Sequence, residues 1–203
     1  DDKITIIPAE ARIISSAGLQ AGDTWRFEDL ARFVLITSSN GGATAIARVT
    51  EQKAGNNNFI SLMNKKAQSL SLENTFFVNP TGLDVAGQHS GSYSTTEEIT
   101  LLMNHLWQQE PDLLASTGLT STTFTTDSGR RYSAVNTNQE MNIMPGLVAS
   151  KTGYTGNAGG NLTTVIDIGP GHYYIVTALG STREQRTEDI SKMIFTLIKS
   201  LKQ

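Results

Sequence analysis

The amino-acid sequence predicts an α+β fold, with an antiparallel sheet flanked by helices. In the first half of the chain, apolar residues recur mostly at helical spacing, whereas segments typical of strands dominate the second half. A C-terminal stretch then returns to helical spacing. Separate runs of helices and of strands are typical of α+β folds. The 203 residues suffice for a single compact domain over residues 1–203.

Most of the predicted helices lie in the first half. A short strand over residues 4–7 comes first, and we expect Pro8 to end it because proline cannot donate to a sheet. Asn40 is the expected cap of the second helix. Ser94 or Thr95 caps the last helix of this half. The helices are predicted over residues 27–36, 43–49 and 56–70, and from residue 95 to the residue before Pro111.

The second half changes to the alternation typical of strands. Asp127-Ser128-Gly129 is the expected turn of a hairpin. Three longer strands follow, and a terminal amphipathic helix closes the chain. The strands are predicted over residues 119–125, 130–135, 147–152, 162–168 and 173–179, and the helix over residues 187–201, with Ile190, Met193, Ile194, Leu197 and Ile198 facing inward.

Composition excludes several classes of protein. Hydrophobic residues make up 38% of the chain and charged residues 17%, which is typical of a globular protein. The formal net charge of −3 gives no basic face for a nucleic-acid partner. The chain has no cysteine, which excludes disulfides, thiolate zinc sites and a cysteine nucleophile. No apolar run reaches the roughly 18 residues that a membrane-spanning helix needs.

Lys151-Thr152-Gly153 is the strongest local signal, near the end of a predicted strand. The lysine offers a cation to a substrate carboxylate, and the threonine hydroxyl adds a second donor beside it. Glycine removes the side chain that would obstruct a substrate lying against the strand. The alternative interpretation is a lysine that ends a surface strand before a glycine turn.

Ser38-Ser39-Asn40 is the second signal, in a break between two predicted helices. A serine and an asparagine two positions apart on a loop can both face a cleft. The hydroxyl can then relay a proton, and the amide can hold a peptide group of a substrate. Taken alone, the tripeptide is better explained as loop and helix-cap material before Gly41 and Gly42.

Together, the two motifs resemble part of a known active-site set. Ser-x-x-Lys, Ser-Asp-Asn and Lys-Thr-Gly occur together in penicillin-binding proteins and class A β-lactamases. This chain has counterparts of the last two, in the expected order. From about residue 4 to its end, it resembles the low-molecular-mass D-alanyl-D-alanine carboxypeptidases, a family of penicillin-binding serine DD-peptidases. The resemblance is carried by residues 69–77, 79–84, 136–138 and 151–155.

The resemblance implies catalytic roles for three residues. Ser38 would lie beside the catalytic lysine and pass a proton towards the leaving amine. Asn40 would hydrogen-bond the amide of the substrate. Lys151 would stabilise the negative end of the substrate and tune the neighbouring serine.

The resemblance also implies a substrate-binding segment. Thr152 and Arg186 would bind the terminal carboxylate, and Arg183 is a second candidate for the arginine. The backbone N–H of Tyr154 would supply one donor of an oxyanion hole. The implied substrate-binding residues are Thr152, Gly153, Tyr154, Thr155 and Arg186.

The reaction that the resemblance implies is hydrolysis of the terminal D-Ala-D-Ala bond of peptidoglycan stem peptides through an acyl-enzyme. It needs no cofactor and no metal. β-Lactams would bind as mimics of the dipeptide. Because the substrate lies outside the cytoplasmic membrane, the parent protein would belong to the bacterial periplasm or cell envelope. Its signal peptide and any membrane anchor would lie outside these residues.

The chain also departs from the family pattern. Ser39 replaces the aspartate of the second motif, and Tyr154 replaces a histidine found in some relatives. No Ser-x-x-Lys occurs in the 203 residues; residues 50–53 have the spacing with threonine, but they follow Ser38. The nucleophilic serine needs that lysine as its activating base. We therefore expect a truncated catalytic domain, without the N-terminal strands and the nucleophile helix, that cannot be acylated by itself.

Two other classes of hydrolase lack their sequence motifs in this chain. His89, His105 and His172 are isolated and form no His-Glu-x-x-His motif, which argues against a zinc-dependent peptidase. The chain has no Gly-x-Ser-x-Gly elbow for a Ser-His-Asp hydrolase. A non-catalytic relative that binds peptidoglycan or a partner protein is the alternative. A Ser-x-x-Lys encoded upstream of Asp1 would decide for the enzyme.

Overall fold

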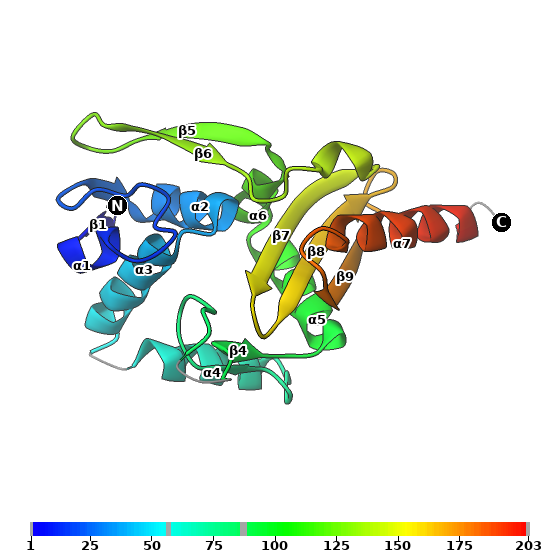
Figure 1. Ribbon diagram of the computed structural model, residues 1–203, viewed down its shortest axis with the longest axis horizontal. Helices are drawn as coiled ribbons and strands as arrows, with labels where there is room; N and C mark the ends of the chain where they lie inside the picture. The colour runs from blue at the N-terminus through cyan, green and yellow to red at the C-terminus, as the bar shows by residue number, and fades with distance from the viewer. Residues whose placement is uncertain (1, 56–57, 86–88, 202–203) are drawn as a thin grey trace.

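The computed structural model describes residues 2–55, 58–85 and 89–201. A helical lobe formed mainly by the first half of the chain lies beside a sheet lobe formed by the second half (Figure 1). In chain order the elements are β1 (Lys3–Thr5), α1 (Pro8–Ala11), β2 (Thr24–Arg26), α2 (Phe27–Thr37), α3 (Asn40–Lys53), α4 (Phe59–Ser69), β3 (Phe76–Phe77), β4 (Ser92–Tyr93), α5 (Thr96–Gln109), α6 (Pro111–Ala115), the 3₁₀ turn η1 (Ser116–Gly118), β5 (Ser121–Thr125), β6 (Arg131–Val135), the 3₁₀ turn η2 (Met141–Ile143), β7 (Leu147–Thr155), β8 (Gly159–Asp167), β9 (Tyr173–Ser181) and α7 (Arg186–Ser200).

The helical lobe is packed around α2. Leu30, Phe33 and Ile36 recur at helical spacing along this helix and are fully buried. The ring of Trp25, from β2, lies 5.0 Å from that of Phe33 and 4.9 Å from that of Tyr132, which belongs to β6. These aromatic contacts attach the β5–β6 hairpin to α2, so the hairpin extends along the helical lobe (Figure 1).

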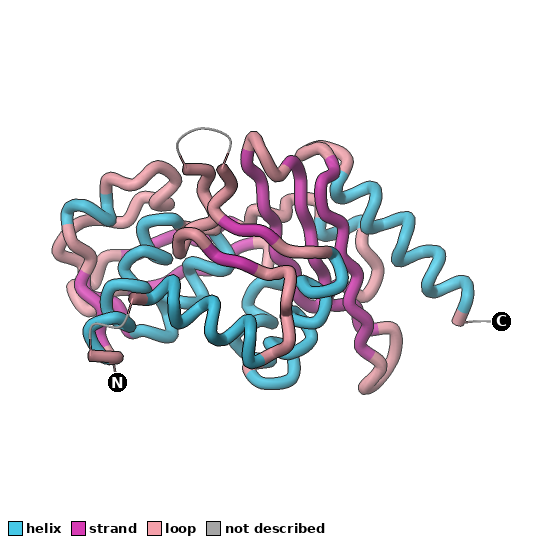
Figure 2. Tube along the Cα trace, turned by 90° about the horizontal axis from the view of Figure 1, so that it is seen from below, coloured by secondary structure: helices cyan, strands magenta, loops and turns pink. Residues whose placement is uncertain are grey.

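The sheet lobe is built on the antiparallel strands β7, β8 and β9, paired in that order. Alternate residues of a strand point to opposite faces of a sheet. On one face, Leu162 and Ile166 of β8 pack against Ile190 and Ile194 of α7. On the other face, Val165 packs against buried residues of α5 and α6. Figure 2 shows α7 running beside the strands towards the C-terminus. The α+β fold with an antiparallel sheet packed against helices is therefore as predicted.

The predicted helices of the first half are present with shifted ends. The prediction that Asn40 caps the second helix is wrong, because Asn40 is already its first residue. Ser39 is the cap, and its hydroxyl accepts a hydrogen bond from the N–H of Gly42 at 3.1 Å. Thr95 caps α5 by accepting from the N–H of Glu98. The third helix begins at Phe59, and residues 56–57 of its predicted range lie outside the described residues.

Two predicted strand ends and the predicted orientation of one helical residue need correction. The first strand ends at Thr5, and Pro8 instead begins α1, since proline suits the first helical position. β7 and β8 pair as far as Thr155 and Gly159, so Lys151-Thr152-Gly153 lies inside β7 and not near its end. Met193 is exposed, because α7 faces the sheet through Ile190 and Ile194 and Met193 lies to the side of that stripe.

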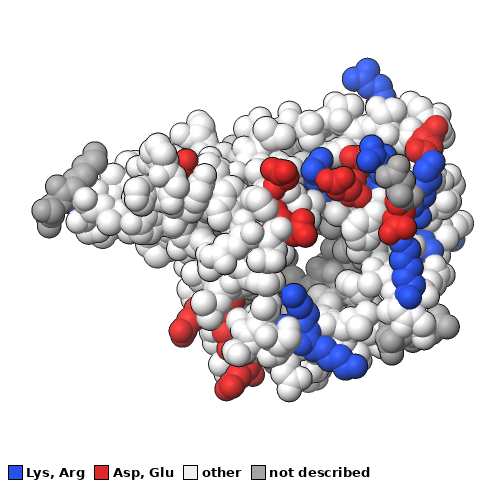
Figure 3. All heavy atoms as spheres, turned by 180° about the vertical axis from the view of Figure 1, so that it is seen from behind, with Lys and Arg blue, Asp and Glu red and all other residues white. Residues whose placement is uncertain are grey.

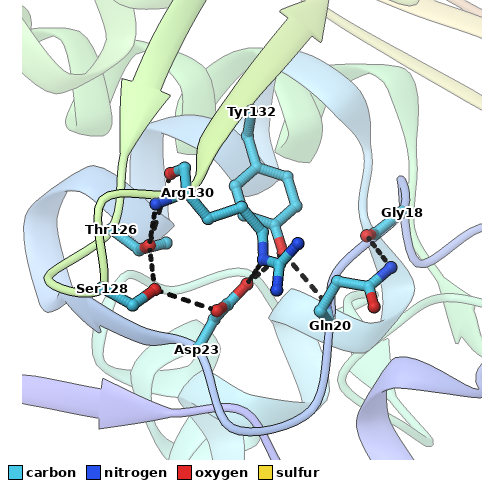
Figure 4. Close-up of polar contacts among 7 residues, drawn as sticks. All are labelled: Gly18, Gln20, Asp23, Thr126, Ser128, Arg130 and Tyr132. Atoms are coloured by element: carbon cyan, nitrogen blue, oxygen red, sulfur yellow. Dashed lines mark hydrogen bonds and ion pairs between the residues drawn. The ribbon is translucent and has the colours of Figure 1, made fainter.

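Asp23 ties the β5–β6 hairpin to the N-terminal part of the chain (Figure 4). Its carboxylate is buried and accepts hydrogen bonds from the Tyr132 hydroxyl at 2.5 Å and from the Ser128 hydroxyl at 3.1 Å. Arg130 Nε lies 2.7 Å from the same carboxylate. Burial, together with the hydrogen bond to Asp23, raises the pKa of Tyr132 to about 12, so the phenol stays protonated and donates at neutral pH. The Tyr132 oxygen also accepts from the N–H of Gln20.

Candidate active site

A cleft of about 900 Å³ brings together segments of both lobes. Its walls come from the end of α2 and the start of α3, from β7, from residues 80–83 and 137–140, and from the start of α7. Figure 3 shows the molecule hollowed on the side opposite to the view of Figure 1. The residues proposed from the sequence all line this cleft: Ser38, Asn40, Lys151, Thr152, Gly153, Tyr154, Thr155 and Arg186.

Ser38 has an unusual backbone conformation at the end of α2. Its φ of 53° and ψ of 41° lie in the left-handed region, which costs a residue other than glycine about 1–2 kcal/mol. Local strain of this kind is common at functional sites. The turn carries the serine hydroxyl into the cleft, where it accepts a hydrogen bond from Lys151 Nζ.

Lys151 reaches Ser38 from the middle of β7. Its Nζ also donates to the backbone carbonyl of Thr152 at 2.8 Å. Burial, and secondly the charge of Arg186, lower the pKa of Lys151 to about 8. At neutral pH the amine is therefore still mostly protonated and can only donate. Ser38 Oγ accepts from it, which leaves the hydroxyl proton of Ser38 available for another group in the cleft.

Arg186 is a further cation of the cleft. It is the first residue of α7, is 9% exposed, and donates through one terminal guanidinium nitrogen to the carbonyl of Gly153 at 3.0 Å. Burial and the nearby Arg183 lower the pKa of Arg186, yet a guanidinium keeps its proton at neutral pH. With Lys151 and the Thr152 hydroxyl lining the same cleft, these cations can hold a carboxylate.

The two other residues of the Ser38-Ser39-Asn40 motif hold the loop before α3. Ser39 is buried, and its hydroxyl donates to the carbonyl of Ser16 at 2.7 Å. An aspartate could not make this donation when ionised, which gives a structural reason for serine at this position. Asn40 donates its side-chain N–H to the carbonyl of Ile14 at 2.9 Å, so its side-chain oxygen is left to accept from a ligand.

Residues 80–83 form a further wall of the cleft, in a loop that Asn79 supports. The side-chain oxygen of Asn79 accepts from the N–H groups of Thr81 at 3.0 Å and Gly82 at 2.7 Å. The carboxylate of Asp84 then accepts from the N–H of Asn157 at 3.1 Å, which connects this loop to the β7–β8 turn. The segment around Asn79, which was central to the sequence resemblance, thus shapes the cleft.

Gly153 is not required by the packing of the fold. A Cβ at this position would meet only the side chain of Asn161, at 3.6 and 3.8 Å, which are ordinary contacts. Both residues line the cleft. We predict that Gly153→Val keeps the thermal unfolding midpoint near that of the wild type but weakens binding of a peptide in the cleft about 10-fold or more, since the added side chain fills part of the cleft. Calorimetric titration with a D-Ala-D-Ala peptide, the ligand that the sequence resemblance implies, measures the effect, and unchanged affinity would contradict it.

Two cleft features escaped the sequence interpretation. The hydroxyl of Thr137 lies 2.6 Å from that of Thr152, and no spacing rule pairs residues 15 positions apart across separate elements. Arg183 lies over the ring of Tyr154, with its guanidinium carbon 5.6 Å from the ring centroid. Of the two candidate arginines, Arg186 is thus the one that donates directly to the Lys151-Thr152-Gly153 strand.

The described parts of the chain contain no group of three or more histidine, aspartate or glutamate residues that could hold a metal ion. Within the same residues, no helix has both the length and the apolar character needed to cross a membrane.

Comparison with known proteins identifies a family that matches most of the chain. The family model described as D-alanyl-D-alanine carboxypeptidase matches residues 6–178. D-alanyl-D-alanine carboxypeptidase DacF of Bacillus subtilis is 30% identical over 176 residues, which cover 87% of this chain and 43% of the relative. The chain therefore spans less than half the length of that curated relative.

Solved structures support the same assignment. Penicillin-binding protein D2 of Listeria monocytogenes, in its ampicillin-bound form, is 29% identical, with a TM-score of 0.75 over 96% of this chain and 77% of that one. A mutant of a Streptomyces DD-transpeptidase shares the fold with a TM-score of 0.83, at 24% identity, over 98% and 80% of the two chains. From the family match and the shared fold, we conclude that this chain belongs to the D-alanyl-D-alanine carboxypeptidase family.

Proposed function

We propose that this chain forms the substrate clamp and part of the proton relay of a serine-type D-alanyl-D-alanine carboxypeptidase of the bacterial cell envelope. The observation that carries the proposal is the contact between Lys151 and Ser38. These residues lie 113 positions apart, on β7 and at the end of α2, and they meet inside the cleft. Burial lowers the pKa of Lys151 to about 8, and a lysine with no functional role would contribute little stability from such a position.

The proposal assigns a role in substrate binding or proton transfer to each of five side chains of the cleft. Thr152, Lys151 and Arg186 bind the terminal carboxylate of a peptide that ends in D-Ala-D-Ala. Asn40 accepts a hydrogen bond from the substrate amide through its side-chain oxygen. Ser38, which accepts from Lys151, donates its own proton to the leaving amine when the peptide bond breaks and takes in exchange the proton that the lysine base has removed from the nucleophilic serine. β-Lactams would occupy the same cleft.

The acyl-enzyme step needs a nucleophilic serine with a lysine base. The 203 residues contain no Ser-x-x-Lys, and the proposal assigns this pair to polypeptide encoded upstream of Asp1. On this basis the chain by itself forms no acyl-enzyme. The alternative is a non-catalytic relative that binds peptidoglycan stem peptides through the same cleft.

Intact-mass measurement after incubation with benzylpenicillin tests the proposal. The 203-residue chain is compared with a longer polypeptide that includes the upstream coding sequence of the same gene. We expect a covalent adduct on the longer polypeptide and none on the shorter one. The absence of an adduct on both would contradict the enzyme and favour the non-catalytic relative.

A further inference from the structure

We propose that Thr137 is a positioning residue that directs the hydroxyl proton of Thr152 into the cleft and thereby sets the preference for a free terminal carboxylate. The inference rests on the proposed function, because it concerns the binding of that carboxylate. Thr137 lies just after β6 and lines the cleft beside Thr152.

The two hydroxyl groups form a short pair. Thr137 Oγ1 lies 2.6 Å from Thr152 Oγ1, so one of them donates to the other. Each hydroxyl has a single proton to give. If Thr152 donated to Thr137, the Thr152 hydroxyl would have no proton left for a ligand. A carboxylate bound by the Thr152 hydroxyl, as proposed above, therefore requires Thr137 to donate to Thr152, and Thr152 to donate to the carboxylate. Successive hydroxyl groups in such a chain polarise one another and strengthen the outer hydrogen bond.

Thr137 is held in place by its own backbone and by its neighbours. Its N–H donates to the carbonyl of Ile36 at 3.2 Å, close to the end of α2. Asn136 and Asn138 are buried on either side of it. The side chain of Asn136 donates to the carbonyls of Thr117 and Leu119, at 2.8 and 2.9 Å. The segment is therefore held on both sides of Thr137, whose hydroxyl lies against that of Thr152 in the cleft.

A second set of contacts connects this segment to β7. The side chain of Asn138 donates to the hydroxyl of Ser150 at 3.0 Å. Ser150 directly precedes Lys151, and its N–H donates to the hydroxyl of Thr117 at 3.0 Å. Thr137 and Thr152 are thus held by one buried polar network. Such a network fixes their relative position more firmly than the single hydroxyl contact would.

Affinity for two peptides separates the role of Thr137 from that of the cleft as a whole. The probes are N-acetyl-Lys-D-Ala-D-Ala with a free carboxylate and the same peptide with a C-terminal amide. Their dissociation constants are measured by NMR titration of the 203-residue chain. We expect the wild type to prefer the free acid and Thr137→Val to reduce that preference about 3- to 10-fold, as one hydrogen bond would.

Matched variants exclude a change in folding. Thr137→Ser keeps the hydroxyl and should retain the preference, whereas Thr152→Val should lose it. Thr123→Val, on the exposed side of β5, makes the same substitution away from the cleft and should change neither affinity. The amide affinity of Thr137→Val should also stay near that of the wild type, because the amide does not need the directed proton.

Two outcomes would overturn the inference, and only the second also contradicts carboxylate binding by the cleft. If the wild type prefers the free acid and Thr137→Val keeps the full preference, the positioning role is wrong and the proposed function stands. If the wild type binds acid and amide equally, carboxylate recognition by this cleft is wrong, and the role of Thr137 falls with it.

Discussion

Replacement of Lys151 by methionine should weaken binding of a peptide with a free terminal carboxylate about 10- to 100-fold, the value of a charge-assisted hydrogen bond. Methionine keeps the length and apolar stem of the side chain but carries no charge. It also removes the donor to Ser38 Oγ and to the Thr152 carbonyl. NMR titration with N-acetyl-Lys-D-Ala-D-Ala measures the loss. The amide form of the peptide should lose much less affinity.

The same substitution should abolish a pH dependence. Because the pKa of Lys151 is about 8, wild-type affinity for the acid peptide should fall as the pH rises through 8 and the ammonium loses its proton. The variant should show no such fall, since Arg186 keeps its proton over this range. Titrations at about pH 6.5, 8 and 9.5 separate the pH profile of the wild type from that of the variant.

As the pH rises through 8, the free energy of unfolding of the wild type should increase, whereas its affinity for the acid peptide should fall. The folded-state pKa of Lys151 lies below the ordinary value of 10.5, so the unfolded chain holds the proton more tightly. The buried cation therefore costs stability below pH 8, and this cost disappears as the pH rises towards 10.5. Lys151→Met should unfold at a higher urea concentration than the wild type at pH 7.

Lys65→Met is the matched control, because Lys65 is exposed on α4. It should alter neither the affinity, nor the pH profile, nor the urea midpoint beyond the small effect of a surface charge. If Lys151→Met bound the acid peptide as tightly as the wild type, the assigned role of Lys151 in the clamp would be wrong.

Local sequence patterns were sufficient for the longer elements of the fold. Periodicity located α2, α5 and α7, because the apolar residues of each recur at helical spacing on the side that packs into the core. Ends were less predictable where two residues compete for one role. Ser39 and Asn40 are both good caps, and only the carbonyls of Ser16 and Ile14, brought close by folding, decide between them. Pro8 suits the end of a strand and the start of a helix equally.

The candidate site required more than periodicity. The sequence shows the Ser38-Ser39-Asn40 and Lys151-Thr152-Gly153 motifs. That the two motifs lie close together in space was expected only from the family resemblance. The structure places Ser38 against Lys151 across 113 residues. The pair of Thr137 and Thr152 depends on buried contacts of the neighbouring asparagines, which no motif encodes. Hydroxyl groups carry no period or charge by which a sequence could reveal such a pair.

Replacement of Asp23 by alanine should lower the free energy of unfolding by about 2–4 kcal/mol. The buried carboxylate is the shared acceptor for the hydroxyls of Tyr132 and Ser128 and for Arg130 (Figure 4). Without it, the buried phenol of Tyr132 has lost its acceptor, and the contact between the hairpin turn and the N-terminal segment is broken. Urea unfolding of the two proteins at pH 7 measures the difference.

Asp127→Ala provides a control on the same hairpin turn. Asp127 pairs with Lys3 at 2.6 Å, but the side chains are 38% and 56% exposed, and an exposed ion pair contributes about 0–1 kcal/mol. Both variants remove one carboxylate that links the hairpin to the N-terminal segment, so they differ mainly in burial. A larger loss for Asp23→Ala would show that the buried network, and not charge pairing alone, holds β6 and the following Thr137 segment in place. Equal losses would contradict this account.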